Sequence, residues 1–363
     1  MEKTRFILST GALNPLVSLN RALRSKSFDG ARFFILTDAN TVDLCLPTLI
    51  SSVAALDECA FFELPEGEAC KDIGVAQDLW LQLMDCHADR NAVIINLGGG
   101  ALCDLGGFVA ASYKRGIRFV NVPTTLLAMV DAAVGGKTAI NVGGVKNQVG
   151  FFHSPTIICI NPAFLRTLPD KELQSGLFEI IKTYAVCDAG RCNKTLDKLA
   201  CDELFVDDEL VCDCAMLKST VAGEDFYDRG RRKILNFGHT LGHAIESVSL
   251  KHDDNPMSHG QAVGLGMAGA VWLSVRKTGL DRAVATDFVQ RTATLFDDID
   301  GLAAHYDEIL DCMRADKKAT SGTYNFVLLK DLGRPVVDVH VSESEALDAL
   351  AFALGQKKTA SFW

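Results

Sequence analysis

The sequence predicts an α/β half built on a parallel sheet, followed by a mainly α-helical half. In the first part of the chain, short apolar runs alternate with helical patterns, the βαβ rhythm of a parallel sheet with helices on both faces. After about residue 160, long helical patterns replace this rhythm. We therefore divide the chain into residues 1–160 and 161–363.

Four strands are expected in the first half because each is a short apolar run that ends in turn residues. They lie in "ARFFILTDAN" (31–40), "CAFFELPEGEACK" (59–71), "NAVIINLGGG" (91–100) and "IRFVNVPTT" (117–125). Between the second and third, "VAQDLWLQLMDC" (75–86) has the spacing of a helix.

Helices dominate the second half. "PDKELQSGLFEIIKTYAV" (169–186) begins with Pro169, a residue suited to a first helical turn. Further helices are expected over 203–224, 236–249, 259–278, 283–296 and 305–314. Residues 323–339 predict a β-hairpin that turns near Asp331 to Pro335.

Composition limits the function. The chain has 363 residues, 48% of them hydrophobic and 23% charged, which is enough apolar material for a core. A net charge of −10 argues against a nucleic-acid partner, which needs a basic face, but leaves room for a small anion at a local cationic site. The twelve cysteines form no CxxC pair, and we find neither a signal peptide nor a membrane-length apolar run. We therefore expect a cytoplasmic protein with reduced thiols and no membrane partner.

Two glycine-rich segments indicate anion binding. Gly98–Gly100 follow a strand and precede a helix, which suits the close approach of a diphosphate, and a tight turn between strand and helix is the less favoured alternative. In "VGGKTAIN", the spacing of a P-loop is missing. Lys137 is either a cation presented to an anionic ligand or a solvated surface lysine.

The second half carries candidate metal ligands. In "GLFEIIK", Glu179 and Lys182 share one helical face, as a surface pair or as a buried site. "NFGHTLGHAIE" and "SHGQAV" supply His239, His243 and His259. Two histidines and one carboxylate with an open position form a recognised catalytic zinc pattern, but spacing does not choose between the histidines.

Taken together, these motifs resemble the 3-dehydroquinate synthases of the sugar-phosphate cyclase family. The resemblance runs from about residue 35 to about residue 330 and rests on "GGGALCDLGGFVAASYKRGIRFVNVPTTLLAMVDAAVGGKTAIN", "KNQVGFF", "LPDKELQSGLFEIIK", "NFGHTLGHAIE", "HGQAV" and "DKK". It implies an N-terminal Rossmann-like α/β domain that binds NAD and a helical C-terminal domain that binds metal and substrate. It also implies a lyase of the shikimate pathway that converts 3-deoxy-D-arabino-heptulosonate 7-phosphate to 3-dehydroquinate and phosphate with NAD and a divalent metal, zinc or cobalt.

The resemblance assigns roles residue by residue. It gives Glu179, His239 and His259 to the metal, and makes Lys137, Lys182, His243 and Asp131 catalytic. Substrate binding falls to Arg115, Asn147, Lys218, Arg232, Asn236 and a lysine of "DKK", Lys317 or Lys318. NAD binding falls to Asp38, Asn40, Glu68, Lys71, Gly99, Gly100, Asp104, Thr124, Thr125, Lys146, Thr167, Leu168 and Glu172. Arg115 matches an arginine that reaches the neighbouring subunit, which implies a homodimer.

The sequence departs from the family pattern at a few positions. Gln261 replaces the glutamate of "HGEAV", Ala132 and Ala133 replace two serines, and Phe178 replaces an alanine. The Gln261 change removes a charge near His259, which would affect metal affinity or the orientation of the ring.

Three other functions compete with this one. Cyclases that make a valiolone or a deoxy-inosose differ at the carboxylate-facing positions, where Lys218, Arg232 and Asn236 have the dehydroquinate-type identity. Metal-dependent alcohol dehydrogenases share the architecture but lack so dense a set of cations. A non-catalytic metal-binding protein has no need for intact cofactor positions.

Overall fold

The computed structural model describes residues 4–9, 14–143, 145–201, 206–253, 256–296, 305–316 and 323–355. Packing divides the chain into two compact units. Unit 1 contains residues 1–173 and 206–227, and unit 2 contains residues 174–205 and 228–363.

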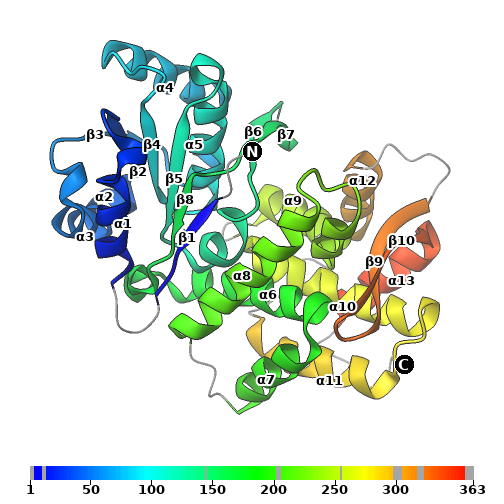
Figure 1. The fold of residues 1–363 in the computed structure, drawn as a ribbon. Helices are drawn as coiled ribbons and strands as arrows, with labels where there is room; N and C mark the ends of the chain where they lie inside the picture. The colour runs from blue at the N-terminus through cyan, green and yellow to red at the C-terminus, as the bar shows by residue number, and fades with distance from the viewer. Residues whose placement is uncertain are drawn as a thin grey trace. The chain divides into compact units, whose positions relative to one another are not determined.

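Unit 1 is built on a parallel sheet of six strands (Figure 1). Their order is β1 (Arg5–Ile7), β8 (Ile157–Cys159), β5 (Arg118–Pro123), β4 (Val93–Gly98), β2 (Phe33–Asp38) and β3 (Ala60–Leu64). The four expected strands are confirmed, while β1 and β8 were not predicted because three residues are too few for a pattern. Since every pairing is parallel, the carboxyl ends of all six strands lie along one edge.

Helices and a hairpin complete unit 1. The helices are α1 (Pro15–Leu23), α2 (Ala39–Leu44), α3 (Leu46–Ser52), α4 (Ile73–Asp85), α5 (Gly100–Ser112) and α8 (Asp208–Glu224). The antiparallel hairpin of β6 (Lys137–Val142) and β7 (Val145–Phe152) was not predicted. Short helical segments are η1 (Lys26–Phe28), η2 (Ala54–Leu56), η3 (Gly67–Cys70), η4 (Tyr113–Arg115), η5 (Ala128–Ala132) and η6 (Pro162–Thr167).

The core of unit 1 lies where α4 and α5 cover the sheet. Phe34 and Ile94 from the strands pack with Leu79 of α4 and with Leu105 and Phe108 of α5. The apolar runs of β2, β4 and β5 are therefore buried, which removes their surface from water and stabilises the sheet, whereas β3 at the edge of the sheet is mostly exposed.

Unit 2 is mainly helical (Figure 1). It contains most of α6 (Asp170–Cys187), then α7 (Ala189–Ala200), α9 (His239–His252), α10 (His259–Lys277), α11 (Arg282–Thr292), α12 (Tyr306–Asp316) and α13 (Glu343–Leu354). The hairpin of β9 (Thr323–Asp331) and β10 (Arg334–Ser342) is confirmed, and η7 (Arg231–Asn236) and η8 (Ala293–Leu295) are short turns. The helix expected from residue 236 begins instead at His239, because η7 occupies the preceding residues.

Helix α10 is the centre of unit 2. Its residues 260–274 are all buried, and it packs against α9, α11, α13 and β9. At Gly260, a Cβ would lie 2.0 Å from the backbone oxygen of Ser175, so only glycine allows α6 and α10 to approach this closely. Among the described helices, none combines the length and the apolar character needed to cross a membrane.

Candidate functional site

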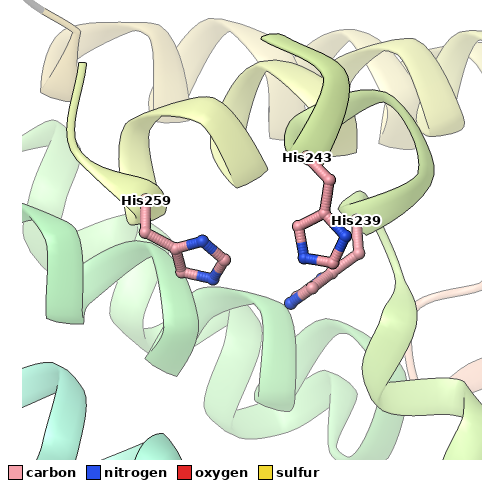
Figure 2. A group of neighbouring side chains, drawn as sticks. All are labelled: His239, His243 and His259. Carbon is pink, nitrogen blue, oxygen red and sulfur yellow. The ribbon is translucent and has the colours of Figure 1, made fainter. Parts of the chain in front are cut away.

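Two helix starts bring three histidines together in unit 2. His239 begins α9, His243 follows one turn later, and His259 begins α10. Figure 2 shows the three rings facing a common space. Their ligand atoms all lie within 4.8 Å of one another, a separation over which one cation can be shared.

A buried carboxylate from α6 faces two of these rings. Glu179 is 0% exposed, and its Oε1 lies 3.9 Å from Nε2 of His239 and 3.7 Å from Nε2 of His259. Its Oε2 pairs with the ammonium of Lys182, which is also buried. Among the described residues, Glu179 Oε1 has no hydrogen-bond partner. A buried, unpartnered carboxylate oxygen is costly, so this oxygen and the two imidazoles fit a divalent metal ion.

The far sides of the two rings are held by acceptors. Nδ1 of His259 lies 3.0 Å from Oε2 of Glu246, and Nδ1 of His239 lies 3.2 Å from the backbone oxygen of Phe237. With Nδ1 donating to an acceptor, the lone pair of each ring is on Nε2, the atom that faces Glu179. This is the outer-shell arrangement that orients metal-binding histidines.

The sequence analysis did not single out Glu246, although it is 8% exposed and contacts a proposed ligand. A signal was present in "GHTLGHAIE". Glu246 follows His239 by seven residues and His243 by three, so all three share one face of α9. A carboxylate on that face is a candidate for contact with the histidines.

The structure shows what Gln261 does. Its Oε1 accepts from the backbone N–H of Ser258 at 3.2 Å, and Ser258 Oγ accepts from the N–H of Gln261, which is a capping box at the start of α10. The carboxylate that contacts His259 comes from Glu246 instead. The substitution therefore leaves this support of the ring in place.

In unit 1, the strand ends expected to hold NAD lie on one edge. Asp38 ends β2 and caps α2 by accepting from the N–H of Thr41 at 2.8 Å. Gly99 follows the neighbouring strand β4 and caps α5. The chain passes from β2 to β3 on one side and from β4 to β5 on the other, which makes the β2/β4 pair a switch point of the sheet, the usual ligand position in such folds.

A polar network lies nearby in the same unit. The ammonium of Lys71, 2% exposed, donates to Asp104 Oδ2 at 2.7 Å and to the side-chain oxygen of Asn147. Asn141 joins it by donating to Glu68 Oε2 at 2.8 Å and accepting from the N–H of Asn147 at 2.9 Å. Burial lowers the pKa of Lys71, but the carboxylates of Asp104 and Glu68 outweigh it and hold that pKa above its ordinary value. Lys71 is therefore a fixed positive charge.

Lys218 of α8 is joined to Asp131 of η5. The ammonium donates to Asp131 Oδ1 at 2.6 Å and to the backbone oxygen of the same residue at 2.5 Å. The structure thus pairs a residue expected to bind substrate with one expected to be catalytic.

The other expected residues lie at varied depths. Arg232 is buried and Asn236 is exposed, both in η7 just before His239. Thr124 is buried, Thr125, Lys146 and Leu168 are partly buried, and Asn40, Arg115, Lys137, Thr167 and Glu172 are exposed. Lys317 and Lys318 lie outside the described residues.

Comparison with known proteins identifies the family. The family model for the N-terminal part of 3-dehydroquinate synthase matches residues 61–175, and the model for the C-terminal part matches residues 176–319. The 3-dehydroquinate synthase of Parabacteroides distasonis is 36% identical over 91% of this chain and 93% of its own length. That of Dehalococcoides mccartyi is 39% identical over 81% of each chain.

A solved structure shares the fold. The 2-epi-5-epi-valiolone synthase of Streptomyces hygroscopicus, solved with NAD+ and Zn2+ bound, aligns with a TM-score of 0.81 over 98% of both chains at 22% identity. At that identity, the likeness concerns the fold alone. The family models and the two relatives cover most of the sequence, and the chain therefore belongs to the 3-dehydroquinate synthase family.

Proposed function

We propose that this protein converts 3-deoxy-D-arabino-heptulosonate 7-phosphate to 3-dehydroquinate and phosphate, a step toward the aromatic amino acids. Relatives of that name, 36% and 39% identical over most of the chain, support this activity. The structural observation that carries it is the unpartnered carboxylate oxygen of Glu179, which faces two imidazoles.

We propose Glu179, His239 and His259 as the ligands of a divalent metal, zinc or cobalt. The distances from Glu179 Oε1 to the two Nε2 atoms and the acceptors behind both rings support this choice. His243, the exposed member of the trio, is then left to exchange protons with the substrate. When bound, the metal would supply Lewis-acid polarisation of substrate oxygens, and NAD would supply a reversible hydride acceptor.

We assign NAD to residues 1–160, and metal and substrate to residues 161–363. The switch point at β2/β4 supports NAD binding near Asp38 and Gly99, with Glu68, Lys71 and Asp104 close by in the sheet's own unit. A Cβ added at Gly100 would lie 2.8 Å from the Cβ of Ala132. Glycine at this position therefore allows the start of α5 to pack closely against η5.

The cations suit a substrate that carries a phosphate and a carboxylate. Buried Lys182, Lys218 and Arg232, with Lys137 and Lys317 or Lys318, would supply its counter-charges. Lys182 keeps Glu179 paired on the oxygen that does not face the histidines, and Asp131 holds the ammonium of Lys218 in position for an incoming anion.

We propose further that the enzyme works as a cytoplasmic homodimer. All twelve cysteines are free thiols, as a reducing compartment requires. Arg115 is exposed in a turn with φ +68°, so its side chain is accessible to a partner subunit. Several apolar side chains on β6 and β7 are exposed, which supports contact of this surface with a second subunit. They are Val142, Val145, Val149, Phe151 and Phe152.

The decisive assay follows phosphate release and NADH absorbance together, with NAD well below substrate. We expect many phosphates released per NAD and no stoichiometric rise in NADH, because the hydride returns to the molecule that gave it. Identification of the carbocycle separates this activity from other cyclases. Phosphate release that stops when NAD is spent, with equal NADH formed, would show an oxidoreductase.

A further inference from the structure

A second group of metal-binding side chains lies at the opposite end of α9. His252 is the last residue of this helix, and it meets His305 and Glu308 at the start of α12. The ligand atoms of these three residues all lie within 4.8 Å of one another. Thirteen residues separate His252 from His239, about 20 Å along a helix, so this group is distinct from the site at Glu179.

The contacts within the group bring its ligand atoms together, and one ring must turn out of the stack for both imidazoles to direct a lone pair at a shared ion. Nε2 of His252 lies 2.7 Å from Glu308 Oε2, and the rings of His252 and His305 stack with centroids 4.2 Å apart. A divalent cation would replace the proton that joins His252 to Glu308.

The neighbouring groups decide which cation fits. Lys251 donates to the same Glu308 oxygen at 3.0 Å, but its side chain is 67% exposed and can swing into solvent. Cys312 follows Glu308 by one turn of α12 and shares its helical face, but its thiol is not among the three clustered ligand atoms. Two imidazole nitrogens favour zinc over magnesium or calcium.

We propose that His252, His305 and Glu308 form a second zinc site, with three protein ligands and an open position. The site joins the end of α9 to the start of α12. It does not depend on the catalytic activity proposed above, because none of its residues belongs to that machinery.

The test is a zinc titration of full-length protein first stripped with a chelator, read by equilibrium dialysis and metal analysis. We expect two zinc ions per wild-type chain, one for His305→Ala, one for His239→Ala and none for the double variant. His340→Ala, which removes an exposed histidine of β10, is the matched control and should keep both ions. Glu308→Gln, which preserves side-chain volume, should weaken the second ion at least tenfold.

Circular dichroism of each variant establishes that it is folded. A wild-type chain that binds a single ion, lost in His239→Ala and kept in His305→Ala, would overturn the proposal. The proposal would also be overturned if His305→Ala and Glu308→Gln, both folded, each still bound two ions. If His305→Ala loses one ion and His239→Ala loses none, the result supports this second site. That result would contradict the ligands proposed for the catalytic metal.

Discussion

At the scale of single residues, the strongest feature is a carboxylate kept in the protein interior. Glu179 and Lys182 are both nearly inaccessible to water, and a buried ion pair rarely repays its desolvation by mutual attraction alone. The second oxygen of Glu179 faces two imidazoles and has no hydrogen-bond partner among the described residues. The metal ion proposed at that oxygen would offset this cost, so a functional role would explain the pair better than stability does.

The histidines are expected to differ in a metal assay. His239→Ala and His259→Ala should each lose the ion held with Glu179, because both Nε2 atoms face its free oxygen. His243→Ala should keep that ion and lose turnover. Metal analysis of the three purified variants measures this, and equal metal loss in all three would contradict the proposed division of roles.

Glu246 is expected to tune metal affinity without touching the ion. Glu246→Gln should weaken metal binding by roughly 10- to 100-fold, because the charge that orients His259 is lost. Gln261→Glu is the matched control and should leave affinity nearly unchanged, since residue 261 caps α10. Metal competition with a chromogenic chelator gives both affinities, and a larger effect at position 261 would reverse the assignment.

At the scale of elements, helix starts position the chemistry of unit 2. A left-handed residue, Gly238 at φ +80°, starts α9, and the capping box of Ser258 and Gln261 starts α10. The first residue of each helix is a proposed metal ligand. The backbone geometry at each helix start therefore determines the position of that imidazole. Helix α13 begins with a similar box, formed by Ser342 and Glu345.

The cap of α13 is expected to give the fold an acid-sensitive contribution. Hydrogen bonds from Lys277 and then from Ser342 lower the pKa of Glu345 to about 2 from an ordinary 4.5. A depressed pKa in the folded state contributes stability that is present above pH 4.5 and is lost as the pH falls toward 2. Glu345→Gln should therefore cost about 0.5–1 kcal/mol at pH 7, where the cap and a surface pair both operate, and less at pH 3.

Urea unfolding of the two proteins at pH 7 and pH 3 measures the difference. The stability gap should narrow at the lower pH, because the unfolded carboxylate is protonated there. A gap of the same size at both pH values would show that Glu345 acts through shape rather than charge.

At the scale of the whole molecule, the chain builds two units and passes between them more than once. Residues 206–227, which include α8, belong with the sheet although they follow the start of the helical unit. Lys218 is thereby held against Asp131 within unit 1. The positions of both residues thus depend on the path of the whole chain.

Assembly provides a test at this scale. Val145→Lys combined with Val149→Lys should convert the proposed dimer to monomer, because charge on the exposed face of β7 opposes burial in an interface. Val17→Lys on α1 matches Val149 in exposure, at 45%, and should leave the proposed dimer intact. Sedimentation velocity distinguishes the species, and a dimer that survives the double substitution would place the interface elsewhere.

The fold class, the adjacent strands β5, β4, β2 and β3 and most helices of the second half could be predicted from the amino-acid sequence, because periodic burial of apolar side chains is a local signal. Strands β1 and β8 could not be predicted from this signal, because a strand of three residues depends on pairing with a neighbouring strand. The motifs also named the histidines and Glu179, by resemblance rather than by geometry.

The partners of these side chains could be identified only from the three-dimensional structure. It joined Glu246 to His259, Lys71 to Asp104, and Lys218 to Asp131, residues separated by 13, 33 and 87 positions. It also showed that Glu179 faces His239 and His259. The physical reason is that a local pattern tells which face of an element is buried, whereas the partner of a buried charge depends on which distant elements pack against that face.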